Sequence, residues 1–126
     1  MLHHRHYTAQ EANHQLEAVG AIVRRIRDAR HRLGVEDEDS GFSTLAELTG
    51  GAWPGAEHAT ASVEIALGFS QLETLDVVVR DLEQGLIDFP SLLDGEEVYL
   101  CWMLGEPSVG HWHAVEGGFL GRHPLD

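Results

Sequence analysis

Apolar residues along the first third of the chain recur at steps of three and four, the spacing of one face of an α-helix. The stripe consists of Leu16, Val19, Val23, Ile26 and Leu33. Thr8 and Glu11 form a capping-box pattern ahead of it, and Gly34 is a helix stop signal. The pattern therefore predicts a long amphipathic helix that begins after Thr8 and ends at Gly34.

The middle of the chain predicts a break between two helices. Residues 36–41 are acidic and indicate a solvated loop, residues 43–48 can form a short helix, and residues 50–55 combine glycine and proline into a strong break. A second long helix should begin near Glu57, with apolar residues Ala59, Val63, Ile65, Ala66, Leu67, Phe69 and Leu72. These cover a wider arc than those of the first helix, so we expect burial between that helix and a sheet.

The last third of the chain is typical of strands joined by turns. Three successive valines at 77–79 favour a strand, although apolar residues at 72, 75, 79 and 82 also fit a continued helix. The other predicted strands cover residues 86–89, ended by Pro90, residues 97–104 and residues 109–115, with turns at Gly85 and at Asp94-Gly95.

Together these elements predict one α+β domain over residues 1–126. An N-terminal antiparallel helical hairpin (residues 8–75) packs on one face of a four-stranded antiparallel β-meander (residues 77–115), and an irregular tail follows at 116–126. Two amphipathic helices on one sheet leave an apolar edge, so we expect a homodimer formed through the helices. The N-terminal segment, with histidines at positions 3, 4 and 6, is expected to be mobile.

The formal net charge of −13 is distributed unevenly. Residues 1–33 hold six arginines and three acidic residues, whereas the rest of the chain holds two arginines and 18 acidic residues. A chain this acidic repels phosphate backbones and anionic lipid surfaces, which argues against nucleic-acid and membrane partners. It has no secretory leader pattern and no apolar run of membrane-spanning length, so we expect a cytoplasmic protein.

The most specific chemical pattern is the pair His111 and His113 on a predicted strand. Residues two apart point to the same face with Cα atoms roughly 6.5–7 Å apart, so both imidazoles can reach one metal ion. Hairpin register decides whether Cys101 joins them. If paired residue numbers sum to 214, Cys101 lies opposite His113 and shares a face with both histidines, whereas a sum of 213 separates them. We prefer 214 because it gathers Trp102 and Trp112 on one buried face.

In the preferred register Asp88 or Glu106 can complete a site for a transition metal such as zinc. A metal ion with an open coordination position can activate water for hydrolysis. The alternative is that the histidines are ordinary residues of a half-exposed strand, which is the more common situation. Cys101 is expected to be a small buried residue rather than a nucleophile, because no ordered histidine and carboxylate surround it in the sequence.

A second candidate site involves the end of the chain. Arg122 with His123 can hold an anionic ligand against the sheet, and the aromatic residues Trp102 and Trp112 are candidates for the same ligand site. The structural alternative is that Asp88 caps a turn or forms an ion pair with Arg122.

Several short motifs in the chain form a specific set. They are Arg80-Asp81, Gly85 to Pro90, Asp94-Gly95, Val98 to Trp102, Gly105-Glu106, Trp112-His113, Gly117 to Phe119 and Gly121-Arg122, with Tyr7-Thr8 and Glu11 to Asn13 near the start. This set resembles an uncharacterised prokaryotic family, domain of unknown function 2203. The resemblance implies a soluble bacterial protein and supplies no established activity.

Two classes of function fit these observations. The first is a non-catalytic binding or assembly module that forms homodimers. The second is a metal-binding protein or a metal-dependent small-molecule hydrolase that uses the strand histidines. We favour the first because it does not require several ligands to converge on one metal ion. Stoichiometric metal in protein purified without an affinity tag would favour the second.

Overall fold

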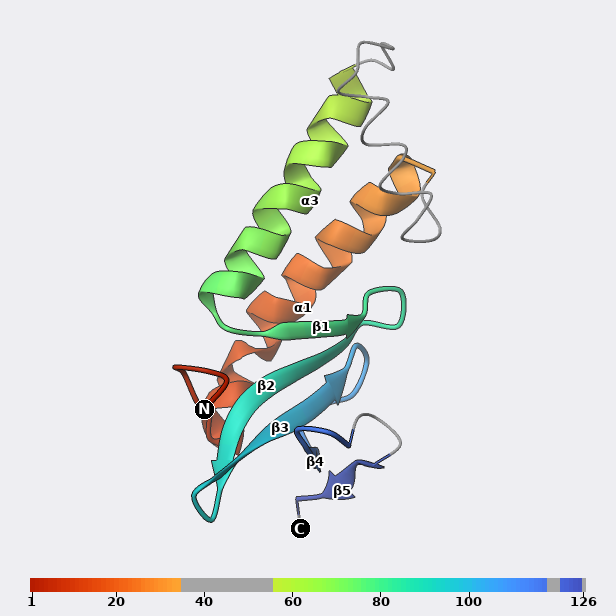
Figure 1. Ribbon diagram of the computed structural model, residues 1–126. Coiled ribbons are helices and arrows are strands. Elements are labelled where there is room, and N and C mark those ends of the chain that lie inside the picture. Colours follow the sequence, from red (N-terminus) through yellow and green to blue (C-terminus); the bar gives the residue numbers. More distant parts are fainter. Residues whose placement is uncertain (35–55, 118–120, 126) are drawn as a thin grey trace.

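Two helices and one antiparallel sheet make up the described part of the chain, residues 1–34, 56–117 and 121–125 of a computed structural model. In Figure 1, α1 (Ala9–Arg32) and α3 (Ala56–Thr74) lie side by side and antiparallel, with the sheet near the N-terminal end of α1. The strands are β1 (Val78–Asp81), β2 (Leu86–Leu93), β3 (Glu96–Met103), β4 (His111–Ala114) and β5 (His123–Pro124). The α+β class is confirmed, with five strands rather than four. The acidic loop, short helix and break predicted at residues 36–55 lie outside the described residues.

Helix α1 has the ends that its sequence predicts. The Thr8 hydroxyl accepts a hydrogen bond from the Glu11 amide (3.1 Å), and the Glu11 carboxylate accepts one from the Thr8 amide (2.8 Å). Gly34 follows the helix with a φ of 73°, a left-handed conformation that glycine adopts without strain. The buried face of α1 comprises Ala12, Val19, Gly20, Ile22, Val23, Ile26 and Ala29. Neither α1 nor α3 is apolar over a length sufficient to cross a membrane.

Helix α3 packs on α1, but only its C-terminal end reaches the sheet (Figure 1). Leu72 joins the main core with the sheet, whereas Ala61 packs with Ala29 and Leu33 of α1 in a smaller cluster. Val63 and Leu67, on the outward side of α3, remain 56% and 58% exposed. The expectation that α3 is buried between α1 and the sheet is therefore wrong, because both helices extend beyond the sheet.

The turns follow the glycine and aspartate signals of the sequence. Asp76 has a φ of 60°, which ends the helical geometry after α3, and β1 begins two residues later. The strand prediction for this ambiguous segment is thus confirmed. Gly85 has a φ of 70°, and Asp94 and Gly95 have φ values of 51° and 82°, the two positive angles of a two-residue type I′ hairpin between β2 and β3.

Strand β2 continues through Pro90, where the sequence predicts its end. The Pro90 carbonyl accepts a hydrogen bond from the Tyr7 amide (2.7 Å), so this edge of the residue faces the N-terminal segment rather than β3. The missing N–H of proline lies on the same edge as its carbonyl, and no hydrogen bond to β3 is lost. The predicted end was wrong because the sequence does not say which edge of a strand a proline faces.

The register between β3 and β4 differs from the preferred one by two residues. Cys101 lies opposite His111, Leu100 opposite Trp112 and Tyr99 opposite His113, so paired residue numbers sum to 212. The predicted pairs Cys101–His113 and Trp102–Trp112 are therefore wrong. The connection is longer than predicted, because the Met103 amide donates to Glu106 Oε1 (2.7 Å) and the Val109 amide to Asn13 Oδ1 of α1 (2.7 Å) rather than to the opposite strand. Because side chains alternate with a period of two, the shift leaves every residue on its predicted face.

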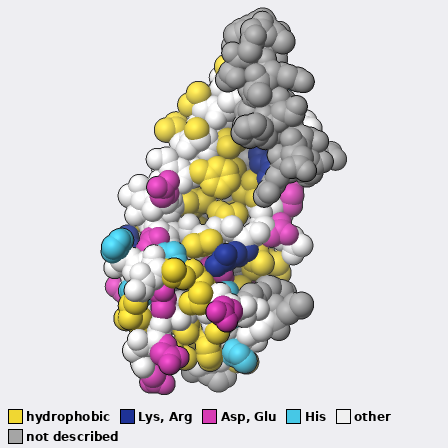
Figure 2. All heavy atoms as spheres, in the orientation of Figure 1, with side chains coloured by type: hydrophobic (Ala, Val, Ile, Leu, Met, Phe, Trp, Pro, Cys, Tyr) yellow, Lys and Arg dark blue, Asp and Glu magenta, His cyan; other side chains and the backbone are white. Residues whose placement is uncertain are grey.

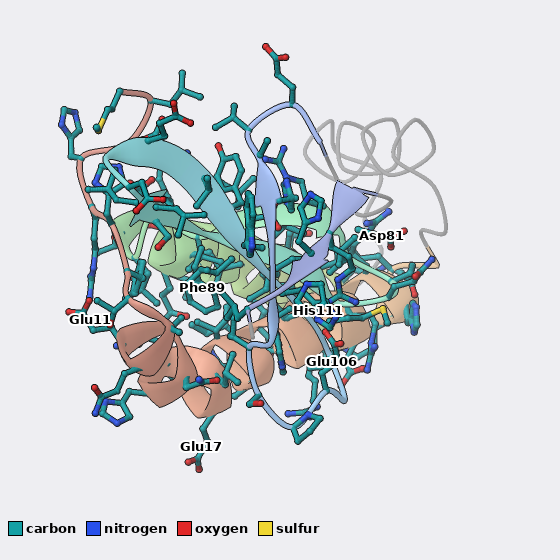
Figure 3. The ribbon with its side chains drawn as sticks, turned by 90° about the horizontal axis from the view of Figure 1, so that it is seen from below. Glu11, Glu17, Asp81, Phe89, Glu106 and His111 are labelled. Carbon is teal, nitrogen blue, oxygen red and sulfur yellow. The ribbon has the colours of Figure 1, made fainter. Side chains whose placement is uncertain are left out.

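The two faces of the sheet differ in chemistry. Ile87 and Phe89 of β2, with Leu100 and Trp102 of β3, belong to the main core that they share with α1. In Figure 3 Phe89 lies between the sheet and α1, while Glu17 projects from the far side of α1. The alternate residues Asp88, Tyr99, Cys101 and His113 lie on the opposite face. β5, from the tail predicted to be irregular, pairs with β4 and widens the sheet.

Candidate functional site

Three polar side chains are buried on the face of the sheet that points away from the helices. Asp88 of β2 and Cys101 of β3 are each 1% exposed, and His113 of β4 is 2% exposed. Asp88 and Cys101 are directly paired across the two strands, and His113 lies opposite Tyr99 on the same face as Cys101. One ligand atom from each residue lies within 4.8 Å of the others. We call these three residues the buried triad.

Both ring nitrogens of His113 face oxygen atoms that accept hydrogen bonds. Nδ1 lies 2.7 Å from the backbone carbonyl oxygen of Ala114, and Nε2 lies 2.9 Å from Oδ2 of Asp88. A backbone carbonyl can only accept, so Nδ1 carries a proton. Nε2 then needs a second proton, or a bound cation in its place, to be compatible with the Asp88 carboxylate.

Arg80 of β1 is a fourth member of this network, which sequence analysis did not identify. Its Nε donates to Oδ2 of Asp88 (2.7 Å), and its guanidinium lies 4.9 Å from the centre of the Tyr99 ring. The Arg80 side chain is 42% exposed, so it lies between the buried triad and solvent. Oδ1 of Asp88 is buried and has no hydrogen-bond partner among the described residues. The sequence signal that could have identified Arg80 was the hairpin of β1 and β2, since its register places Arg80 near Asp88.

The N-terminal segment is held against the same face. His3 Nε2 lies 2.7 Å from the Tyr99 hydroxyl, and His3 Nδ1 lies 2.9 Å from Oδ1 of Asp76. The Glu97 carboxylate accepts hydrogen bonds from the amide of His3 (3.0 Å) and from the His6 ring (2.8 Å). These contacts correct the expectation of a mobile terminus, because three acidic or hydroxyl groups of the fold fix it.

Cys101 is not arranged as a nucleophile. Burial, and then the negative charge of Asp88, raise the pKa of its thiol to about 11, although the positive charge of Arg122 opposes this shift. A nucleophilic cysteine needs a histidine nitrogen to take its proton, and both nitrogens of His113 bond to oxygen atoms of Asp88 and Ala114. The buried triad therefore does not form a Cys-His-Asp catalytic triad.

Two other predicted metal ligands lie outside the buried triad. His111 is opposite Cys101, yet it does not belong to the group of converging ligand atoms among the described residues. Its Nδ1 is buried and has no hydrogen-bond partner among those residues. Glu106 forms an ion pair with Arg122 (3.0 Å) and accepts a hydrogen bond from the Met103 amide (2.7 Å). The predicted pair of Asp88 with Arg122 is wrong, because Asp88 pairs with Arg80 and His113, and Arg122 pairs with Glu106.

The residues of the second candidate site have different neighbours. Trp102 is part of the main core, and its Nε1 donates to the Glu106 carbonyl (2.9 Å). Trp112 packs against His123 with ring centres 4.8 Å apart and ring planes tilted by 37°, and it lines an apolar pocket of about 250 Å³. Neither Trp102 nor Arg122 lines that pocket, so the structure does not gather these residues at one ligand site.

Comparisons with known proteins place the chain in a family. No curated protein and no solved structure matches the chain. The model of one family, described as an uncharacterized conserved protein (DUF2203), matches residues 5–125. The match covers nearly the whole chain and includes Asp88, Cys101 and His113. The chain therefore belongs to the family named domain of unknown function 2203.

Proposed function

We propose that this protein is a small binding module that holds one divalent transition-metal ion, with zinc as the natural fit, through Asp88, Cys101 and His113. One observation carries the proposal: three potential ligand atoms from three neighbouring strands lie within 4.8 Å of one another. Each of the three residues is at most 2% exposed. Buried groups of this kind are usually paired with one another or with a metal ion.

The chemistry of the three ligands suits zinc. A thiolate, an imidazole and a carboxylate are the groups that bind Zn²⁺ in proteins, and the mixed set is less suited to Mg²⁺ or Ca²⁺, which prefer oxygen. The carbonyl of Ala114 accepts the Nδ1 proton of His113 and so leaves Nε2 as the nitrogen available to a metal. Oδ1 of Asp88, buried without a hydrogen-bond partner among the described residues, is the available carboxylate oxygen.

Charge balance supports the same proposal. Without metal, the group contains the neutral Cys101 thiol and one proton shared in the hydrogen bond between Asp88 Oδ2 and His113 Nε2, with Arg80 beside them. A divalent ion that replaces the Cys101 proton and the shared proton leaves the total buried charge unchanged. Arg80 can keep its hydrogen bond to Oδ2 of Asp88 while Oδ1 binds the metal ion. Carboxylates that bind metal ions commonly have such a hydrogen-bond partner.

The low exposure of the three residues favours a structural role for the metal over a catalytic role in hydrolysis. Three protein ligands leave the fourth position of a tetrahedral ion to a small ligand such as one water molecule, whereas a hydrolytic metal needs that position to be within reach of substrate as well. Arg80 lies over the open side of the site, and its neighbour Tyr99 is also buried. The proposal therefore joins metal binding to the non-catalytic module and gives no support to the metal-dependent hydrolase.

The first test is elemental analysis of protein purified without a histidine tag, followed by titration of the metal-free protein with Co²⁺. We expect one ion per chain and a thiolate-to-cobalt charge-transfer absorption, with intensities typical of tetrahedral coordination. Absence of that absorption in folded protein would overturn the proposal. Co²⁺ is the probe because Zn²⁺ has no d–d spectrum.

Variants identify the ligands. Cys101→Ala should remove the charge-transfer absorption, and His113→Ala should weaken Co²⁺ binding by more than the roughly 10–100-fold that loss of a residue behind a ligand costs. His111→Ala is the matched control, because it removes a histidine from the same strand that is not part of the buried triad. If His111→Ala weakens binding as much as His113→Ala, the assigned ligand set is wrong. Circular dichroism of each variant separates lost binding from lost folding.

A further inference from the structure

The outward side of α3 is exposed and carries no charge over most of its length. At helical spacing this side consists of Ala59, Val63, Ala66, Leu67 and Ser70, all of them exposed. From residue 59 to residue 71 the only charged residue is Glu64, and it forms an ion pair with Arg32 of α1. We call these five residues the α3 outer stripe.

The α3 outer stripe contrasts with the rest of the molecule. α1 carries five arginines between residues 24 and 32. In contrast, hydrophobic side chains gather along α3, above a belt of charged side chains around the sheet (Figure 2). The inner side of α3 is also apolar, since Ala61 and Leu72 are buried against α1 and the sheet. A helix that is apolar on opposite sides is typically covered on both.

We propose that a second copy of this chain covers the α3 outer stripe, with the two α3 helices packed antiparallel about a two-fold axis. The inference goes beyond metal binding and uses none of the residues of the buried triad. The dimer then has four helices in a row, with the two α3 helices at its centre and one α1 on each outer side. The sheets lie at opposite ends of the pair.

The stripe is complementary to itself in this arrangement. When facing residue numbers sum to 129, Val63 lies opposite Ala66 of the partner, and Ala59 lies opposite Ser70. Leu67 then lies opposite Ser62. Each large side chain meets a small one, and the two-fold axis repeats every contact, which is the geometry of an isologous interface.

Charge also favours a second copy over a different protein. The chain has a net charge of −13, so two copies repel each other wherever their acidic surfaces meet. Along the α3 outer stripe they can meet without placing like charges together. A partner of opposite charge would gain nothing from contact with an uncharged stripe, since complementary charge is what selects such a partner.

The test is the molecular mass in solution over a series of concentrations, by sedimentation or light scattering. We expect a reversible dimer, and Leu67→Glu should weaken it on the order of a hundredfold or more because two glutamates are buried near the two-fold axis. Leu92→Glu is the matched control, because Leu92 is 45% exposed but lies on β2, far along the chain from α3. A chain that remains monomeric up to about 1 mM would overturn the proposal.

Cysteine cross-linking tests the register. A mixture of Val63→Cys and Ala66→Cys chains should form disulfide-linked dimers faster than either variant alone, while the native Cys101 is buried and should not compete. Fast cross-linking of Val63→Cys with itself would indicate parallel helices and contradict the proposed dimer. A monomer that Leu67→Glu nevertheless destabilises would instead mean that the stripe is covered within one chain, which also overturns the second copy.

Discussion

Gly68 of α3 packs directly against Ile26 of α1, and adding one methyl group there tests how the two helices pack. A Cβ atom built on Gly68 would lie 2.7 Å from Cδ1 of Ile26 and closer still to its Cγ1. Ile26 is fully buried, so its side chain has little room to move. Gly68→Ala therefore forces the two helices apart or pushes Ile26 out of its rotamer.

The expected magnitude is a balance of two terms. Overpacking a tight core costs roughly 1–3 kcal/mol of unfolding free energy. Alanine in a helix interior returns roughly 0.5–1 kcal/mol, because it restricts the unfolded chain more than glycine does. The overpacking term wins, and we expect a net loss of roughly 1–2 kcal/mol.

Gly20 of α1 supplies a matched control. A Cβ atom at Gly20 would lie 3.5 Å from Trp102 and 3.6 Å from Leu104, which are ordinary van der Waals contacts. Gly20→Ala keeps the gain of an interior alanine without the clash, so it should raise the unfolding free energy by roughly 0.5–1 kcal/mol. Both glycines lie on buried helix faces, and the same substitution should thus change stability in opposite directions.

Urea unfolding followed by circular dichroism measures both variants. A second substitution, Ile26→Ala, removes both atoms that the new methyl group would meet, Cγ1 and Cδ1, so Gly68→Ala should cost less in that background. A stability gain for Gly68→Ala alone, of the size expected for Gly20→Ala, would refute the close approach of α1 and α3 at this point. Wild-type slopes of free energy against urea would show that compactness is unchanged.

Three further predictions follow from individual contacts. Burial alone would raise the pKa of Glu97, but hydrogen bonds from His6 and from the amides of Leu2 and His3 lower it from 4.5 to about 2. The stabilisation is present above pH 4.5 and is lost as the pH falls toward 2, so urea midpoints of Glu97→Gln should fall less than those of wild type over that interval. In the metal-free protein, the Cys101 thiol, with a pKa of about 11 against an ordinary 9.0, should contain about a hundredfold less thiolate near neutral pH, and iodoacetamide should label it correspondingly slowly. Thr8→Ala should cost about 1 kcal/mol in thermal or urea unfolding, and an unchanged midpoint would mean that the capping box contributes nothing.

The candidate site shows how far side-chain alternation carries a prediction. Cys101, His111 and His113 share a face in the structure, as the preferred register requires, although the register itself differs by two residues. The prediction of which residues share a face was correct, because it depends only on whether a residue number is odd or even within its strand. The predicted residue pairs between β3 and β4 were wrong, because the length of the connection between these strands depends on the contact of Val109 with α1.

The choice between the two acidic candidates for the buried triad depended on the pairing of β2 with β3. Asp88 was one of two acidic candidates, and only the β2–β3 register places it directly opposite Cys101. Glu106 lies nearer to Cys101 in the sequence, but its carboxylate bonds to Arg122 and to the Met103 amide. Local spacing therefore suggested the types of ligand, and the arrangement of three strands selected among them.

The sequence by itself determined the elements whose signals are local. The capping box at Thr8, the glycine at position 34 and the Asp94-Gly95 turn each act within a few residues, so composition and spacing suffice to predict them. The tertiary structure alone decided which edge Pro90 faces, which partner Asp88 has and which side of α3 remains uncovered. Those outcomes depend on residues far apart in the chain, and their positions are set only when the helices and the sheet pack together.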